Sequence, residues 1–367
     1  MRARVLQKDI LPAVMRTVAI ADKKSVVPIL SHVLMDFNEK GLTLRATDLD
    51  HSIVENVNAE VDTFGTVAVP AGVLGDILRK VSDNMTLEFS VIEKGEKLLV
   101  TAGRFKFELS TLQADDFPSI SRLENTCKFS LKAADLNKLI SRTKFSISPE
   151  ESRHNLNGIF LHKQDDMLKA ASTDGHRLSI SAIPLDAKES IQGVIIARKT
   201  VLELKKLLDI AENEVVVTFS ANQIQFEIGN IVFISKLVDG TFPDYNRVIP
   251  AMDGESFTVK RTDFIEIVDR VAVISDDKVK SVKLGLEKNS LSCYVANNKL
   301  GSGQDVIDVE YDGKGWSAGF NSNYLLDIAQ TLQGTDLKIY VKESLTPILI
   351  TDVSEPESLF VVMPMRI

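Results

Sequence analysis

The chain has 367 residues, of which 44% are apolar and 26% are charged. This composition excludes a wholly disordered chain, and the length predicts roughly two to four domains. The 43 lysines and arginines are outnumbered by 51 aspartates and glutamates, which gives a formal net charge of -8. That balance argues against a nucleic-acid-binding protein of the usual basic kind.

The cysteines and the start of the chain bear on its location. Cys127 and Cys293 lie far apart and neither has a nearby cysteine partner, so the sequence favours neither a disulfide framework nor a cysteine metal site. Lys8, Asp9 and Arg16 interrupt the apolar residues near the start, and we expect no signal peptide. No apolar run approaches the roughly 18 residues of a membrane span. We expect a cytoplasmic protein.

The first third of the chain is predicted to contain two helices and a hairpin. Apolar residues recur at three- and four-residue spacing over Lys8–Ala19 and over Pro70–Lys80, which predicts amphipathic helices. Between them, Val33–Phe37 and Gly41–Leu44 alternate at period two and are separated by turn-forming residues. This pattern predicts a β-hairpin.

The same order of elements returns in the other two thirds. Helix, two hairpin strands and helix are expected in the middle third at Lys132–Phe145, Ile159–His162, Met167–Ala171 and Arg198–Ile210. In the last third the corresponding segments are Arg261–Ser275, Val282–Leu286, Leu291–Val295 and Asn321–Leu332.

Short matching strings support a threefold repeat. Thr47-Asp48 lies 126 positions before Thr173-Asp174, and Phe117-Pro118 lies 125 positions before Phe242-Pro243. We therefore expect an α+β fold of three similar domains, each with two helices on antiparallel sheets. The expected boundaries are 1–122, 123–252 and 253–367. The competing interpretation is three unrelated α+β domains of similar size.

Positive charge concentrates in the predicted helices. Lysines and arginines outnumber acidic residues in the helical segments, whereas the rest of the chain is strongly acidic. If the helices share one face, that face would attract the phosphate backbone of a nucleic acid without reading its sequence. The alternative is that lysine and arginine are simply good helix formers on solvated faces. The helices of the last third weaken the signal, because they are slightly acidic.

Two segments have the character of sites. Thr173–Leu178 predicts a compact polar turn in which His176 and Asp174 have the chemistry of a general base or metal ligand. The other histidines form no ligand-spaced set, so a structural or surface role is favoured for His176. No nucleophile, zinc or nucleotide motif is present. We expect no catalytic residue, no metal and no cofactor.

The second segment is the apolar end of the chain, Leu359–Ile367. Chain ends are usually polar and frayed, so this one is expected to pack against something. Pro364 should end the last strand, since it cannot donate to a sheet. Met363 and Met365 then offer an adaptable surface for apolar side chains, although a role in the core is an equal alternative.

The chain resembles the bacterial DNA polymerase III beta subunit family, the sliding clamps. The strings that carry the resemblance occur in the family's order along the whole chain. They are Val27–Leu30, Ala46–Leu49, Leu109–Leu112, Asp116–Pro118, Leu156–Gly158, Thr173–Leu178, Ser235–Gly240, Phe242–Tyr245 and Val361–Arg366.

The resemblance implies a non-enzymatic processivity factor. It implies a head-to-tail homodimer that closes into a ring around duplex DNA, with helices lining the hole and no dependence on DNA sequence. Implied partners are the replicative DNA polymerase, a clamp loader, and repair and translesion polymerases that carry short clamp-binding motifs. An alternative is a repeat scaffold that binds partner peptides without encircling DNA.

The resemblance also implies site residues. A partner-peptide pocket is expected at Leu156, Thr173, Gly175, His176, Arg177, Leu178, Pro243, Arg247, Val248, Val361 and Met363, with an adjoining part at Asn321, Tyr324, Leu345, Pro364, Met365 and Arg366. DNA contacts are expected at Lys24, Arg153, His154 and Asn155, although His154 and Asn155 replace aromatic residues common in the family. The dimer interface is expected at Phe107, Leu109, Val273 and Ile274.

Overall fold

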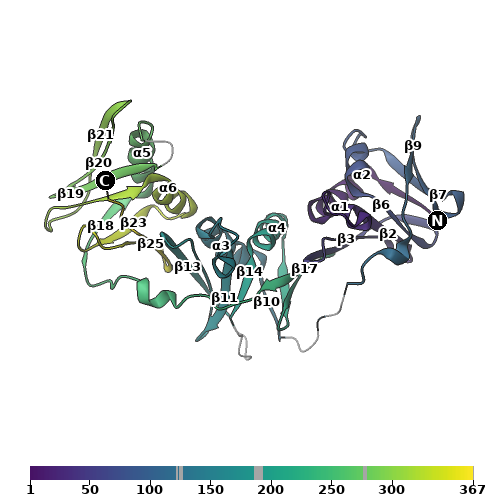
Figure 1. Cartoon of the computed structure of the whole chain (residues 1–367), viewed down its shortest axis with the longest axis horizontal. Helices are drawn as coiled ribbons and strands as arrows, with labels where there is room; N and C mark the ends of the chain where they lie inside the picture. Colours follow the sequence, from purple (N-terminus) through teal and green to yellow (C-terminus); the bar gives the residue numbers. More distant parts are fainter. Residues whose placement is uncertain (121–122, 124–126, 186–192, 276–278, 367) are drawn as a thin grey trace. The chain divides into compact units, whose positions relative to one another are not determined.

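A computed structural model describes residues 1–120, 123, 127–185, 193–275 and 279–366 (Figure 1). Each helix expected from the sequence is present in it. Their bounds are α1 Gln7–Ile20, α2 Ala71–Leu78, α3 Ala133–Thr143, α4 Arg198–Leu208, α5 Arg261–Ala272 and α6 Ser322–Thr331. The helix expected to reach Phe145 ends at Thr143 and continues as a 3-10 turn, Lys144–Ser146.

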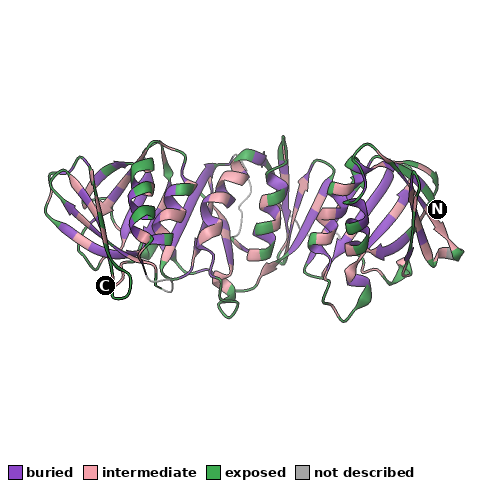
Figure 2. Ribbon diagram, turned by 90° about the horizontal axis from the view of Figure 1, so that it is seen from above, coloured by how far each residue is buried: buried purple, intermediate pink, exposed green. Residues whose placement is uncertain are grey.

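The helices form where the apolar spacing predicted them. Helix α5, for example, buries Phe264, Ile267, Val268 and Val271, which lie three and four residues apart and therefore share one face. Figure 2 shows exposed residues along one side of the helices and buried residues along the strands beneath them. The helices therefore cover the sheets and leave their polar faces to solvent.

The chain divides into two compact units, which are described separately. Unit 1 comprises Met1–Ala134 and Lys206–Leu237. Its strands are β1 Arg2–Leu6, β2 His32–Asn38, β3 Gly41–Thr47, β4 His51–Val57, β5 Glu60–Thr63, β6 Gly65–Pro70, β7 Thr86–Ile92, β8 Lys97–Ala102, β9 Phe105–Ser110, β10 Cys127–Lys132, β15 Glu214–Phe219, β16 Gln223–Ile228 and β17 Ile231–Val238.

Antiparallel pairing organises unit 1. A five-stranded sheet has the order β5-β1-β7-β8-β9, so β9 is an edge strand. The expected hairpin is present as β2 and β3, and its turn needs Gly41, which has a φ of 108°. Helices α1 and α2 lie side by side over a core of apolar residues from both sheets (Figure 1). Arg16 of α1 donates a hydrogen bond of 2.7 Å to the buried carboxylate of Glu55 on β4.

Unit 2 comprises Asp135–Lys205 and Val238–Ile367. It contains most of α3 and α4 and all of α5 and α6. Its strands are β11 Gly158–Gln164, β12 Met167–Thr173, β13 Arg177–Pro184, β14 Val194–Ala197, β18 Glu255–Lys260, β19 Ser281–Glu287, β20 Ser290–Asn297, β21 Gly301–Asp308, β22 Trp316–Asn321, β23 Asp336–Val341, β24 Ile348–Asp352 and β25 Glu355–Val362.

Two arrangements in unit 2 position the site. Strands of the middle third and of the last third share a sheet, because β13 pairs with β25 along Leu178 and Val361. A four-stranded sheet has the order β21-β20-β19-β22, so β21 is an edge strand. The expected hairpins are present as β11 with β12 and as β19 with β20. The last strand ends at Val362, before Pro364 as expected.

An aromatic cluster in unit 2 surrounds a histidine. Phe160 stacks between His162 and Phe242, and the Tyr245 hydroxyl lies 3.0 Å from His162 Nε2. Among the described residues, the buried Nδ1 of His162 has no hydrogen-bond partner. Burial, and next the charge of Lys169, lower the pKa of His162 from 6.5 to about 4.

We predict that this histidine makes folding depend on pH. Between pH 6.5 and about 4 the unfolded chain binds a proton at His162 that the folded chain does not, so the free energy of unfolding falls as pH falls through this window. His162→Gln removes this titration. Urea denaturation across the pH range should therefore give a flatter profile for His162→Gln than for the wild type. His154→Gln, at an exposed histidine, should follow the wild-type profile; identical profiles for all three proteins would contradict the prediction.

Candidate functional site

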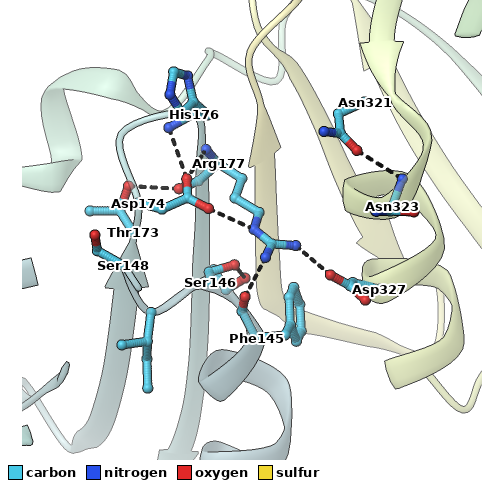
Figure 3. A network of polar contacts seen from close by, with 12 residues as sticks. Phe145, Ser146, Ser148, Thr173, Asp174, His176, Arg177, Asn321, Asn323 and Asp327 are labelled. Atoms are coloured by element: carbon cyan, nitrogen blue, oxygen red, sulfur yellow. Dashed lines mark hydrogen bonds and ion pairs between the residues drawn. The ribbon is translucent and has the colours of Figure 1, made fainter. Parts of the chain in front are cut away.

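The guanidinium of Arg177 is the centre of a polar network in unit 2 (Figure 3). Its Nε donates to Asp174 Oδ2 at 3.0 Å, its Nη1 donates to Asp327 Oδ2 at 2.6 Å, and its Nη2 donates to the carbonyl oxygen of Phe145. The guanidinium carbon also lies 4.2 Å from the ring centroid of Tyr324. Arg177 therefore joins the start of β13 to α6 and to the 3-10 turn after α3.

The 3-10 turn explains why Phe145 can accept this bond. The last carbonyl groups of a helix have no partner within the helix. The ring of Phe145 also contacts this guanidinium, with its centroid 5.3 Å from the guanidinium carbon. Two aromatic faces and three oxygen acceptors therefore surround a side chain that is only 10% exposed.

The Thr173–Leu178 segment forms the turn that presents Arg177. Asp174 Oδ1 accepts the backbone N–H groups of His176 at 2.9 Å and of Arg177 at 3.0 Å. Thr173 Oγ1 donates to the Arg177 carbonyl, and Gly175 supplies the left-handed conformation with a φ of 90°. The Asp174 carboxylate is therefore used by the turn and by Arg177. The imidazole of His176 is exposed above it.

The end of the chain lies against this turn. Met363 N–H donates to the carbonyl of His176 at 2.9 Å, and Leu178 pairs with Val361 across the two strands. The side chains of Leu178 and Val361 are buried in one apolar cluster with Leu156 at its margin. The two segments singled out in the sequence are thus neighbours in the fold.

A cavity of about 400 Å³ lies on one side of the tail. It brings together three of the expected pocket residues, Arg247, Val248 and Met363, with residues of the adjacent connection and of β23. Val248 and Met363 are large apolar side chains that are about half exposed. Pro243 is exposed nearby in sequence, and Arg247 pairs with Asp244 at 2.9 Å. This surface has the apolar walls and polar rim that a peptide side chain requires.

The adjoining part of the expected pocket follows the tail toward α6. Asn321 caps α6, because its Oδ1 accepts the N–H of Asn323 at 2.9 Å. Met365 N–H donates to the carbonyl of Gly319 on β22 at 2.8 Å. Leu345 is 70% exposed, and it lines a second cavity together with Met365 and Arg366. Pro364 is partly buried between the two methionines of the tail.

The residues expected to contact DNA differ in how far they already take part in contacts within the chain. Lys24 is exposed in the loop after α1, in unit 1. In unit 2, Arg153 pairs with Glu150 at 2.9 Å and also donates to the Asp174 carbonyl. Asn155 donates to the Thr241 carbonyl at 3.1 Å, and His154 is exposed. Arg153 and Asn155 therefore have roles in the local fold besides any contact with DNA.

The expected interface residues divide into exposed and buried members. Val273, directly after α5, is 79% exposed, and Phe107 on β9 is 44% exposed. Leu109 is only 8% exposed and belongs to the core of unit 1. Ile274 packs against the core of unit 2. Of the two residues expected at each edge, one is therefore exposed in a single copy: Phe107 on β9 and Val273 after α5.

Sequence reasoning missed two residues of the Arg177 network, Asp327 and Phe145. Asp327 is the one acidic residue of α6 and lies one turn after Tyr324, which was expected in the pocket. A single carboxylate on the same helix face as an expected site residue was the available signal. Phe145 contributes its backbone carbonyl, which no residue pattern indicates.

Two further observations concern metals and membranes. Within the described ranges, no group of three or more His, Cys, Asp or Glu side chains is arranged to bind a metal ion. Among the described helices, none is both long enough and apolar enough to cross a membrane.

We predict that Arg177→Lys destabilises unit 2. A lysine ammonium lacks the planar fork that reaches all three acceptors, so Asp174 and the Phe145 carbonyl lose partners, at a cost of about 2 kcal/mol or more in the free energy of unfolding. Arg247→Lys is the matched control, because Arg247 is exposed and has one ion pair; its change should stay below about 0.5 kcal/mol. Urea denaturation measures both, and equal losses would refute the role of Arg177.

Comparison with known proteins gave concordant results. Three family models match the chain, described as the N-terminal, central and C-terminal domains of the DNA polymerase III beta subunit, at residues 1–121, 130–244 and 246–366. The chain is similar to the beta sliding clamp of Caulobacter vibrioides, at 34% identity over 100% of both chains. It is also similar to that of Escherichia coli K12, at 32% identity over 94% of both.

Solved structures of the same kind match over the full chain. A sliding clamp from Bartonella birtlesii, a DNA polymerase III subunit beta bound to griselimycin, has a TM-score of 0.94 and 39% identity, with 100% of both chains covered. The DNA polymerase III subunit beta of Pseudomonas aeruginosa has a TM-score of 0.94 and 32% identity, again with 100% of both covered.

Proposed function

This chain belongs to the DNA polymerase III beta subunit family, the beta sliding clamps, and from that membership we propose that two copies close head to tail into a ring around duplex DNA. A sliding clamp is a processivity factor and not an enzyme: it tethers the replicative polymerase to DNA. Tethering keeps the polymerase at high local concentration after each dissociation, so rebinding becomes a local event. No bond is made or broken.

The proposed ring rests on one observation: each unit has a sheet with an open edge. Strand β9 pairs only with β8, and β21 pairs only with β20, among the residues that the structure describes. An open edge presents unpaired N–H and C=O groups to another chain. We infer that β9 of one copy pairs with β21 of the other. Two different edges make the contact heterologous, and it closes after two copies in a ring.

Side chains near the two edges suit such a contact. Phe107 and Leu109 lie on β9, and Val273 and Ile274 follow α5 close to β21. The exposed Phe107 and Val273 would be buried between copies, while Leu109 and Ile274 support them from the two cores. Charge also favours the pairing: Arg104 is exposed just before β9 and Asp308 is exposed on β21, whereas Lys106 on β9 already pairs with Glu108 at 2.9 Å.

DNA would pass along the polar faces of the helices. The helical segments carry an excess of lysine and arginine on an otherwise acidic chain. Contacts of this kind, with Lys24, Arg153, His154 and Asn155 as proposed members, reach phosphates and carry no sequence information. Arg153 is partly neutralised by Glu150, so its attraction for a phosphate is reduced. Weak and non-specific contact permits sliding.

Partner proteins would bind at the tail. The proposed peptide pocket consists of Leu156, Thr173, Gly175, His176, Arg177, Leu178, Pro243, Arg247, Val248, Asn321, Tyr324, Leu345, Val361, Met363, Pro364, Met365 and Arg366. The cavity beside Met363 and Val248 supports this assignment. Arg177 acts within it as a positioning residue, because its Nε, Nη1 and Nη2 each already donate to a group of the chain. Leucine and phenylalanine anchors of a partner peptide would contribute about 1.5 to 3 kcal/mol each when fully buried.

The remaining assignments follow from this mechanism. We propose three clamp domains at 1–122, 123–252 and 253–367, which the three family-model matches support. Expected partners are the replicative DNA polymerase, a clamp loader, and repair and translesion polymerases. Opening a closed ring requires energy from outside, so the loader is expected to hydrolyse ATP. We expect this clamp to act in the cytoplasm, where a bacterial clamp meets chromosomal DNA.

The test of the ring is topological. We predict that the loaded protein stays on closed circular DNA and leaves within minutes once a nuclease linearises the circle, because only the covalent continuity of DNA retains a ring. Gel filtration of labelled protein with each DNA form measures this. A peptide-binding scaffold that does not encircle DNA would give equal retention on both forms, and that result would reject the proposal.

We also predict that Val273→Lys weakens the dimer by at least about tenfold in Kd. The substitution replaces a buried apolar contact between copies with a desolvated charge, while the side chain is solvated in a single copy. Ile274 is a poorer target, since it packs in the core of its own unit. Val353→Lys, at an exposed valine between β24 and β25, is the control. Sedimentation at nanomolar to micromolar concentration should show monomers for Val273→Lys alone; an unchanged dimer would refute the interface.

A further inference from the structure

The outer face of the β19–β22 sheet carries a groove that the proposed pocket does not account for. Two cavities, of about 570 Å³ and about 470 Å³, share Lys283, Tyr294, Ser317 and Ser344 as lining residues. Because they share these residues, they form one continuous depression, which we call the outer groove. All of it lies within unit 2.

The alternation of the strands explains why this face is hollow. Val282, Leu284 and Leu286 of β19 are buried beneath the sheet, so the intervening residues face outward. Small residues occupy most outward positions, and the register places them side by side. The outward pairs include Lys283 with Tyr294, Gly285 with Ser292, Lys283 with Gly319, and Gly285 with Ser317. Tyr294 therefore lies beside Lys283, next to a floor of glycine and serine.

The groove is lined by exposed apolar side chains and by positive charges. Tyr294 is 39% exposed, and Leu345 at the margin is exposed to a greater extent, which leaves two large apolar surfaces uncovered. The charged residues that line the larger cavity are Lys283 and Arg366. Lys283 forms no ion pair with another described residue. The larger cavity therefore suits an acidic ligand with an apolar side chain.

The tail connects the groove to the proposed peptide pocket. Leu345, Met365 and Arg366 belong to that pocket and also line the larger cavity. The Met365 N–H holds the tail against Gly319, at the end of β22 that borders the groove. A polypeptide bound at Met363 and Met365 therefore leads directly onto the sheet.

We propose that the outer groove binds the segment of a partner polypeptide that flanks its clamp-binding motif. The segment lies extended across β22, β19 and β20, with an acidic side chain at Lys283 and Arg366 and an apolar side chain against Tyr294 and Leu345. This inference rests on the proposed function, because it extends the same pocket. Glu287 at the far end of the groove would repel a phosphate backbone, which disfavours a nucleic acid as the occupant.

The test compares a core peptide with extended ones on the full-length dimer. The core peptide is short and carries the leucine and phenylalanine anchors. Two further peptides add about six residues, roughly 20 Å in extended form, at the amino or at the carboxyl end. Each extension contains glutamates and one phenylalanine. We expect one of the two extended peptides to bind at least about tenfold more tightly than the core peptide, equivalent to about 1.4 kcal/mol.

Substitutions in the groove test where the additional affinity of the extended peptide comes from. Lys283→Glu and Tyr294→Ser should each reduce it severalfold and leave the affinity for the core peptide unchanged. Lys288→Glu, an exposed lysine in the turn after β19 that does not line the groove, should retain the full gain. Lys283→Glu should in turn prefer a peptide whose extension carries lysines in place of glutamates. Fluorescence anisotropy with each peptide measures these affinities.

The possible outcomes distinguish failure of the outer groove from failure of the proposed peptide pocket. If the core peptide binds and neither extension adds affinity, or if the gain survives Lys283→Glu and Tyr294→Ser, the outer groove is not a partner site. If single-stranded DNA displaces the extension alone, the groove is a nucleic-acid site and the inference is wrong. If the core peptide itself fails to bind the wild-type dimer, the peptide pocket fails, and the inference fails with it.

Discussion

The proposed partner surface of this clamp depends on one largely buried side chain, Arg177. Its guanidinium is shared by Asp174 in the turn before β13, by Asp327 on α6 and by the carbonyl of Phe145. These groups come from parts of the chain that lie far apart in sequence. Because a largely buried guanidinium is costly without partners, the three must stay in register with one another. The turn, the tail that bonds to it and the cavity beside the tail inherit that rigidity.

The repeated architecture could be predicted from the sequence because it is local. The apolar spacing of a helix and the alternation of a strand depend only on consecutive residues, and the expected helices and hairpins are present. The partners of Arg177 could not be predicted in the same way, since Asp327 lies 150 positions away and Phe145 acts through its backbone. Leu109 and Ile274 show the same limit: an apolar residue at the end of an element fits a core and an interface equally well, and only packing separates the two.

Acidity of the whole chain and affinity for DNA are compatible in this fold. Net charge describes the average surface, whereas binding depends on where the charges lie. The helical segments carry more basic than acidic residues, whereas the rest of the chain carries an excess of acidic residues. Specific recognition is proposed for partner proteins, at the tail and in the groove beside it, where apolar side chains and oriented polar groups are available. In this proposal, DNA contact and partner recognition are carried by different surfaces of one chain.

The open edges β9 and β21 have a consequence for assembly in the proposed ring. Each is expected to pair with the other and not with itself, so every copy added in a row leaves one edge of each kind at the ends. Such a row either meets its own beginning or grows without limit into a fibre. Closure of the proposed ring therefore depends on the whole stretch of chain between the two edges and not on the contact residues alone. A substitution far from either edge that prevents closure would convert a closed assembly into a polymer.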